Sequence, residues 1–312
     1  MNAHSVGRNA FRMLYLSRQW MSVGQRSCST STKPTDKQQS GSGAATDSDE
    51  IVKKELYFEN QVLRLIMNDP KKRNALSLRL LETLHKELSS CDSISKLRAI
   101  IIAASPPVFS AGHDLRELRT SEGQAKHAQI MAKCSELMNL IQDMQLPVIA
   151  EVKGVAAAAG CQLAASCDIV IAADNAKFSV PGAKAGVFCS TPGIALARAV
   201  PRKVALDMLL TGDPISAQDA LRAGLVSRIV DESKVEEEAL SVAEKILALS
   251  RPVVGLGKTF FHMQIGMNRH DAYRHGERVM VENLRLADTQ EGISAFVEKR
   301  QPVWTHKTDK VH

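Results

Sequence analysis

Residues 148–178, VIAEVKGVAAAAGCQLAASCDIVIAADNAKF, give the clearest indication of the fold class of this chain. The first five residues of this stretch are apolar or β-branched around one glutamate and predict a buried strand, which Gly154 ends. A run of small residues, 155–160, then leads into a short helix at 161–165, and residues 168–173 predict a second buried strand. A strand, a tight turn, a helix and a strand in this order are typical of a parallel α/β sheet.

The Ala/Gly turn that begins this helix is the first candidate binding feature. Residues without bulky side chains let a ligand approach the backbone closely. A helix N-terminus also presents unpaired N–H groups and a partial positive charge, which suit a carbonyl oxygen that gains negative charge during a reaction. On this stretch alone, the small residues could equally serve only the close packing of two elements, so a second donor must be sought elsewhere.

The preceding part of the chain extends the α/β pattern. Residues 51–58 and 62–67 alternate as two strands around a turn at 59–61. Ser77 is placed to cap a helix whose apolar face is Leu80, Leu81, Leu84 and Leu88. The run RAIIIAA, residues 98–104, predicts a strand buried on both faces, so strand, helix and strand repeat as in a βαβ sheet.

A second small-residue loop supplies the other donor. Residues 105–115, SPPVFSAGHDL, follow the buried strand directly, and a helix is expected to begin at His113 or Asp114. Ligands of open α/β sheets bind at the carboxyl ends of the strands, which is where this loop falls.

The last third of the chain is predicted to be helical. The expected helices cover residues 201–212, 216–224, 234–250, 252–266, 270–288 and 291–297. The apolar faces of the last four exceed what one face of the sheet can cover, which favours an interface between copies. The Gly-Lys pair at 257–258 resembles a phosphate-binding loop only superficially, because the GxxxxGK spacing fails and no strand precedes it.

The first fifty residues do not have the pattern of a folded domain. Four arginines (8, 12, 18 and 26) precede the first acidic residue, Asp36, and residues 27–32 are rich in hydroxyl groups. An arginine-rich, acid-poor start predicts a mitochondrial transit peptide, with residues 33–50 as a disordered linker. A disordered tail with a chance charge distribution is the alternative.

The composition sets wider limits. A hydrophobic content of 44% and a charged content of 24% over 312 residues are ordinary for a globular enzyme, and no apolar run approaches the length of a membrane span. The six cysteines show no CxxC pair and are predicted to be buried, reduced thiols. A net charge of +6 permits a polyanionic partner without demanding one.

Five segments together resemble the enoyl-CoA hydratase/isomerase (crotonase) superfamily over residues 51–304. They are PKKRNALS (70–77), FSAGHDLREL (109–118), the stretch at 147–178, LTGDPISAQDALRAGLVSRIV (210–230) and EGISAFVEKRQPVW (291–304). The resemblance implies an α/β spiral of ββα units over residues 51–245 and a C-terminal helical trimerisation region at 246–312, with hexamers as dimers of trimers. It also implies acyl-CoA thioesters as ligands, a role in fatty-acid metabolism in the mitochondrial matrix, and neither a metal nor a separate cofactor.

The resemblance assigns the oxyanion hole to two backbone N–H groups, those of His113 and Ala159. Both donors are main-chain groups, so the side chains at these positions do not remove them. The His113 side chain is bulkier than the small residue usual in the family and is expected to narrow the acyl channel. A catalytic imidazole is the alternative role for His113.

The two glutamates of family hydratases fall on Gln162 and Gly182. Glutamine does not exchange protons near neutral pH, glycine has no side chain, and losing one general acid or base costs about 10²–10⁴ in rate. Standard hydration is therefore not expected. Ser190 is a possible pocket residue, as a hydrogen-bonding wall, while Glu117 is expected to be solvated.

The resemblance places coenzyme A along two loops. The residues at these positions are Lys71, Arg73, Ala75, Ala111, Asp114, Leu115 and Arg116. Lysine and arginine suit phosphate electrostatically. Three functions remain open: an acyl-CoA enzyme with chemistry other than hydration, a catalytically silent acyl-CoA-binding regulatory or partner subunit, and RNA binding by a basic face. The modest net charge and the lack of an aromatic and basic stripe argue against nucleic acid.

Overall fold

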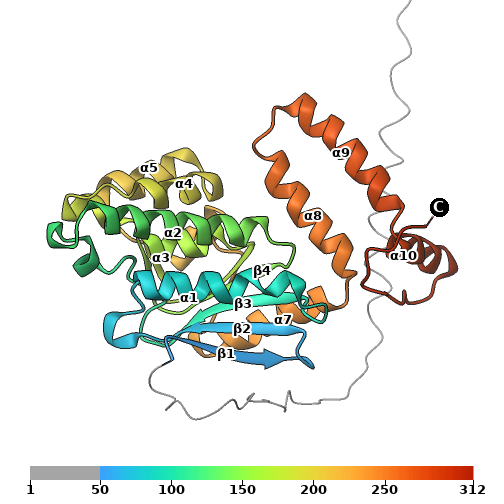
Figure 1. The fold of residues 1–312 in the computed structure, drawn as a ribbon, viewed down its shortest axis with the longest axis horizontal. Helices are drawn as coiled ribbons and strands as arrows, with labels where there is room; N and C mark the ends of the chain where they lie inside the picture. The colour runs from blue at the N-terminus through green and yellow to red at the C-terminus, as the bar shows by residue number, and fades with distance from the viewer. Residues whose placement is uncertain (1–49, 312) are drawn as a thin grey trace, which may run out of the picture. The chain divides into compact units, whose positions relative to one another are not determined.

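A six-stranded sheet of mostly parallel strands organises the fold in the computed structural model, which describes residues 50–311 (Figure 1). The predicted transit peptide and nearly all of the linker lie outside the described residues. The strand order is β1-β2-β3-β4-β6-β9, and only β1 runs antiparallel to its neighbour. The strands are β1 (Val52–Tyr57), β2 (Val62–Met67), β3 (Ala99–Ala104), β4 (Val148–Val152), β6 (Ile169–Ala173) and β9 (Arg228–Val230).

The sequence explains why these segments form a central sheet. Every residue of β2 and β4 is buried, as expected of strands covered on both faces by other elements. The hairpin between β1 and β2 turns through Phe58, Glu59 and Asn60, which all have positive φ angles (51°, 55° and 68°). The α/β class and the antiparallel hairpin at the start of the sheet are confirmed.

Residues 50–311 also contain ten α-helices and six short 3₁₀ helices. The α-helices are α1 (Leu78–Ser89), α2 (Gln124–Asp143), α3 (Ala159–Ser166), α4 (Ser190–Ala199), α5 (Arg202–Thr211), α6 (Ala217–Arg222), α7 (Val235–Leu247), α8 (Arg251–Gln264), α9 (Arg269–Leu284) and α10 (Ala287–Glu298). The 3₁₀ helices are η1 (Pro70–Lys72), η2 (Cys91–Ser93), η3 (Leu115–Leu118), η4 (Thr120–Glu122), η5 (Pro181–Ala185) and η6 (Glu232–Lys234).

Helices cover the sheet on both faces. The Ser77 hydroxyl accepts a hydrogen bond from the Leu80 N–H at 3.3 Å and so caps α1, whose four predicted leucines are all buried. Helix α1 packs against α2, and α7 packs on β3, β4 and β6 (Figure 1). The predicted cap and apolar face are confirmed.

A second, three-stranded sheet lies beside the candidate site. Its strands are β5 (Val155–Ala157), β7 (Lys177–Ser179) and β8 (Ile215–Ser216), with β5 parallel to β7 and β7 antiparallel to β8. The sequence predicted only a turn where β5 occurs. Three small residues show no alternation of apolar and polar side chains that would predict a strand. They form a strand because they pair with β7.

The C-terminal helices have few buried side chains. Helix α9 has none, and α8 buries only Pro252 and Gly255. Helix α8 is joined to the core by Lys258, whose ammonium group donates to the carbonyls of Ile141 and Leu146 at 2.7 and 2.8 Å. The Gly-Lys pair therefore lies inside a helix, and its dismissal as a phosphate-binding loop is confirmed.

Two further expectations concern the chain as a whole. The five cysteines within the described residues are all free and buried, as predicted. Of the helices that the structure describes, none is both long and apolar enough to cross a membrane.

Candidate active site

The loop after β3 and the strand β5 join through Ser110. The Ser110 N–H donates to the Val155 carbonyl at 3.1 Å, and the Ala157 N–H donates to the Ser110 carbonyl at 2.9 Å. The Ser110 hydroxyl donates to the Asn74 carbonyl at 2.8 Å. Three segments far apart in the sequence are thus fixed together at the carboxyl end of β3.

Two glycines allow these loops to approach more closely than side chains would permit. A Cβ added at Gly160 would lie 2.6 Å from the Ser110 carbonyl oxygen. A Cβ added at Gly112, where φ is +89°, would lie 2.8 Å from Ala158 Cβ and 3.2 Å from Ala159 N. The backbone at Gly112 and His113 is therefore held against the N-terminus of α3.

Both predicted oxyanion donors lie at this contact. Ala159 is the first residue of α3 and is fully buried, and His113 directly follows Gly112. Within residues 50–311, neither of these two backbone N–H groups donates to a protein acceptor. The residue before Ala159, Ala158, has a φ of 48° and a ψ of −118°, a sparsely populated backbone region that costs a non-glycine residue about 1–3 kcal/mol. Strain of this kind persists where the surrounding structure enforces it, often at functional sites.

The His113 imidazole is half-buried behind the loop. Its Nδ1 lies 3.3 Å from the Leu76 carbonyl oxygen, which assigns the proton to Nδ1, and its Nε2 is buried without a partner. Burial lowers the pKa of His113 more than the Leu76 carbonyl and the Glu117 carboxylate raise it. The ring is therefore neutral at neutral pH.

Asn74 fixes the loop that carries the basic residues, and the sequence reasoning missed it. It has a φ of 50°, its amide nitrogen donates to the carbonyls of Ser105 and Val108 at 2.7 and 2.8 Å, and its amide oxygen accepts from the Asp69 N–H at 2.9 Å. Asparagine tolerates left-handed backbone better than most residues. That tolerance, in a loop between a strand and a helix, was the available signal.

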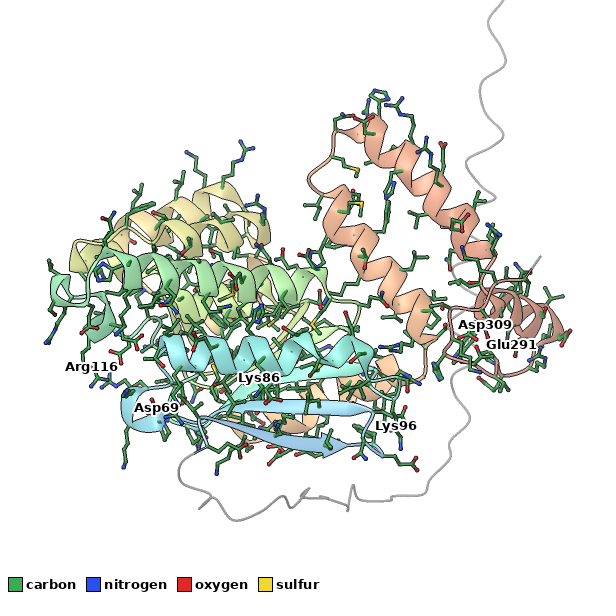
Figure 2. The ribbon with its side chains drawn as sticks, in the orientation of Figure 1. Asp69, Lys86, Lys96, Arg116, Glu291 and Asp309 are labelled. Carbon is green, nitrogen blue, oxygen red and sulfur yellow. The ribbon has the colours of Figure 1, made fainter. Side chains whose placement is uncertain are left out.

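The predicted coenzyme A residues cluster around this loop. Lys71 and Arg73 are exposed, and the Ala111 N–H donates to the Arg73 carbonyl at 3.0 Å. Of the remaining predicted residues, Ala75 is buried, while Ala111 and Leu115 are exposed. Figure 2 labels Arg116 and Asp69 close together at this end of the sheet.

The Asp114 carboxylate is hydrogen-bonded within the protein. Its carboxylate accepts a forked pair of hydrogen bonds from the Arg116 guanidinium, both at 3.0 Å, and this pair lowers the pKa of Asp114. The Arg116 side chain is 61% exposed. Arg116 is therefore partly neutralised but still faces solvent, whereas any coenzyme A contact of Asp114 would have to use its backbone.

The two positions of the family acids differ in how much room they offer. Gln162 is buried on α3, and its amide oxygen lies 3.9 Å from the Cys134 sulfur. Gly182 lies in η5, where an added Cβ would come within 2.1 Å of the Val187 carbonyl oxygen and 2.6 Å of the Cys189 sulfur. Position 162 has space for a carboxylate side chain of the same size, but position 182 does not.

The surroundings of Glu117 and Ser190 can be compared with the predictions made for them. Glu117 is half-buried, and its carboxylate accepts a hydrogen bond from the Leu78 N–H at 2.9 Å. The expectation of a solvated Glu117 was wrong, because the unpaired N–H groups at the start of α1 attract the carboxylate.

Ser190 is exposed as the first residue of α4, a helix that was not predicted, and its hydroxyl donates to the Phe188 carbonyl at 3.4 Å. Among residues 50–311, no group of His, Cys, Asp and Glu side chains is arranged to hold a metal ion.

Comparison with known proteins adds independent findings. A model of the enoyl-CoA hydratase/isomerase family matches residues 57–307. Enoyl-CoA hydratase domain-containing protein 3, mitochondrial, from Homo sapiens is 52% identical over 246 residues, which are 79% of this chain and 81% of that protein. The protein of the same name from Danio rerio is 51% identical over 251 residues, which are 80% of this chain and 87% of that protein.

Solved structures show the same similarity. The crystal structure of the human enoyl coenzyme A hydratase domain-containing protein 3 superposes with a TM-score of 0.79 at 49% identity, covering 82% of this chain and 100% of that chain. An enoyl-CoA hydratase from Mycobacterium smegmatis superposes with a TM-score of 0.80 at 40% identity, covering 82% and 99%.

Proposed function

The chain belongs to the enoyl-CoA hydratase/isomerase family, and from that premise we propose that it binds acyl-CoA thioesters in mitochondria without standard hydratase activity. It takes part in fatty-acid metabolism, either as an enzyme of different chemistry or as a binding subunit. The mitochondrial names of its relatives and the arginine-rich start of the chain support the location, with the matrix as the compartment.

The pair of N–H groups at His113 and Ala159 carries the proposal. Both are backbone donors without protein acceptors, and the contact of Gly112 with Ala158 and Ala159 holds them in place. Donors fixed in advance stabilise the negative charge that develops on a thioester oxygen. The N-terminus of α3 adds its partial positive charge.

The proton-transfer groups of hydration are missing. Gln162 is an amide with no useful titration, and Gly182 has neither a side chain nor the space for one. Each lost group is worth about 10²–10⁴ in rate. Crotonyl-CoA is therefore expected to bind and to be hydrated at a rate near background.

The basic loop supplies the site for the coenzyme A phosphates. Lys71 and Arg73 are exposed on the loop that Ser110 and Asn74 tie to the oxyanion donors, and Arg116 lies at the same end of the sheet. Positive charges beside a backbone hole match a ligand with a phosphorylated nucleotide at one end and a thioester at the other.

We further propose that the chain assembles as trimers or hexamers through its C-terminal helices. Their exposed apolar side chains include Phe261, Tyr273, Met280, Val281, Phe296 and Val297, which are between 55% and 73% exposed. Exposed apolar surface of this kind marks an interface. A stable monomer by light scattering at micromolar concentration would contradict this assembly.

The test is a screen of acyl-CoA thioesters by mass spectrometry that records binding and turnover separately. Retention of acyl-CoA with negligible crotonyl-CoA hydration is expected. Robust hydration that survives Gln162→Ala would show that the catalytic positions are misplaced, and failure to retain any thioester would refute acyl-CoA binding itself. A thioester that is bound and converted identifies an enzyme, whereas one that is only bound identifies the silent subunit.

A further inference from the structure

Two arginines from distant parts of the sequence donate hydrogen bonds to the same segment, residues 92–97, near the start of the C-terminal helices. Arg98 directly precedes β3, and Arg251 is the first residue of α8. The Arg251 Nη2 donates to the Asp92 carbonyl at 2.7 Å, and the Arg251 backbone N–H donates to Nδ1 of His306 at 3.3 Å. Three separate segments of the chain thus contribute Arg98, Arg251 and His306 to one cluster.

Neither guanidinium group has an anionic partner in the part of the chain that the structure describes. Within residues 50–311, the side-chain hydrogen bonds of both arginines go to neutral backbone carbonyls; Arg98 Nη1 donates to Ser95 and Leu97 at 2.6 and 3.0 Å. The Nε atoms of both arginines are buried without any partner. A buried donor left unsatisfied is costly and usually signals an absent water or ion.

The carboxylates of Asp92 and Asp288, two residues that contact the cluster, accept hydrogen bonds from other donors. The Asp92 carboxylate accepts from the backbone N–H groups of Gln145 and Leu146 at 2.9 and 3.2 Å. The fully buried Asp288 carboxylate accepts from Ser250, Thr305 and His306. Neither carboxylate forms an ion pair with the two arginines.

The positive charges affect one another. Burial lowers the pKa of Arg98, and the nearby charge of Arg251 lowers it further. Burial also lowers the pKa of His306, and Arg98 adds to that effect. His306 accepts a hydrogen bond at Nδ1, so its ring is neutral and carries its proton on Nε2 as a further donor.

We propose that Arg98, Arg251 and His306 form a binding site for a divalent oxyanion of the phosphate type. Two guanidinium groups supply two positive charges and several free N–H donors, and their fork geometry matches phosphate oxygens. A bound dianion compensates the charge of both arginines. It also links the start of α8 and the C-terminal segment to the core.

This site is distinct from the proposed coenzyme A surface. Arg98 lies at the amino end of β3, whereas Lys71 follows the carboxyl end of the parallel strand β2. Six residues of strand separate the two ends by roughly 17–20 Å. Figure 2 labels Lys96 and Asp69 at these opposite ends of the sheet.

The experiment uses the full chain and inorganic phosphate as the probe. We expect phosphate at about tenfold above its Kd to raise the Tm by about 3–6 °C relative to chloride at equal ionic strength. Phosphorus NMR line broadening measures the binding directly. Glycerol phosphate, tested beside inorganic phosphate, shows whether the site prefers the free ion or a phosphate monoester.

Three variants decide whether the cluster is the site. Arg98→Gln and Arg251→Gln should each weaken phosphate binding at least about tenfold, the loss expected when one charge-assisted fork is removed. Arg202→Gln is the matched control, because Arg202 is exposed and occupies the first position of α5 as Arg251 does in α8. Arg98→Lys keeps the charge without the fork and provides a second test if a glutamine variant does not fold.

The proposal is overturned if chloride reproduces the stabilisation or if Arg98→Gln binds phosphate as tightly as Arg202→Gln. It is also overturned if Lys71→Gln with Arg116→Gln abolishes the response, because phosphate would then be bound at the coenzyme A surface.

Discussion

Replacing Gly112 by alanine tests whether the glycine contact holds the oxyanion donors in place. Gly112 has a φ of +89°, which costs an L-residue about 1–2 kcal/mol. The new methyl carbon would lie 2.8 Å from Ala158 Cβ and 3.0 Å from the Ala157 carbonyl oxygen. Carbon atoms pack at about 3.5–4.0 Å, so the two loops must separate by roughly 0.5–1 Å. Overpacking of this kind adds about 1–3 kcal/mol, for a total loss of about 2–5 kcal/mol in the free energy of unfolding.

The same displacement should impair thioester polarisation. The added carbon would lie 3.2 Å from Ala159 N, so the movement separates the Ala159 N–H from the His113 N–H. A misplacement of about 1 Å in a reacting site costs on the order of 10²-fold. The assay is the absorbance shift of a bound chromophoric acyl-CoA, measured with denaturant unfolding of the same variant. We expect a reduced shift, while the affinity for coenzyme A itself, which we propose depends on the basic loop, stays within a few-fold of the parent.

Gly123→Ala is the matched control. Gly123 has a φ of +82°, but an added Cβ there meets no atom within 4 Å. Because its ψ of 153° places Gly123 in a backbone region that is nearly exclusive to glycine, this variant should show a backbone cost of about 1–3 kcal/mol and an unchanged absorbance shift. If Gly112→Ala matches Gly123→Ala in both stability and absorbance shift, the contact with α3 does not position the donors and the reasoning fails.

Three further predictions follow from individual contacts. Gly182→Ala should lower the free energy of unfolding by at least about 1–3 kcal/mol, because its Cβ would lie 2.1 Å from the Val187 carbonyl oxygen. For the same reason, the double variant with Gln162→Glu and Gly182→Glu should not restore crotonyl-CoA hydration. Measurable hydration by that double variant would contradict the steric argument. Arg64→Met should cost about 3–5 kcal/mol by denaturant unfolding, because the buried Glu151 carboxylate loses its forked partner at 2.8 and 3.0 Å and keeps only the Lys153 ammonium group at 3.2 Å. Replacing both Arg64 and Glu151 by apolar residues should cost less than the single change. Equal costs would show that the pair is not coupled. The pKa of His113 is lowered in the folded state, so the unfolded chain takes up the proton first and stability falls as the pH drops below about 6.5. The His113→Asn variant should therefore lose less stability between pH 7 and pH 5 than the parent protein does. A pH profile of stability identical to that of the parent would show that His113 is not the group responsible.

Five of the six strands of the main sheet could be predicted closely because they are apolar runs with clear ends, whereas the three-residue strand β9 was not predicted. Residues 62–67 were predicted and observed as β2 with the same bounds, and β3 begins one residue after its predicted start. Helix α2 was not predicted, although it is twenty residues long. Its buried side chains, among them Ile130, Leu137 and Ile141, are spaced among polar residues, so the apolar face is weak in the sequence and is defined mainly by packing against α1 and α3.

The candidate site was predictable in part for a related reason. The sequence placed His113 and Ala159 in small-residue turns, but only the fold shows that Gly112 touches Ala158 and Ala159. The left-handed Asn74 and the carboxylate of Glu117 at the start of α1 depend on contacts between distant segments. For Asn74 the sequence offered only the tolerance of asparagine for left-handed backbone as a signal, and for Glu117 it offered none.

The two parts of the site differ in what the fold requires of them. The proposed oxyanion donors are main-chain groups fixed by Gly112 and Gly160, so losing them would also disturb the packing of β5 and α3. The acid positions carry no such constraint, and at position 182 the packing of Val187 and Cys189 now excludes any side chain. Burial raises the pKa of Cys134 to about 12, and a carboxylate at position 162 would be buried beside this thiol. Desolvation would make that carboxylate unfavourable, because it would have no charged partner there. A neutral amide avoids that cost. The local packing therefore favours a site that holds a thioester oxygen without exchanging protons, and this is the physical reason to expect acyl-CoA binding and hydration to be separable in this chain.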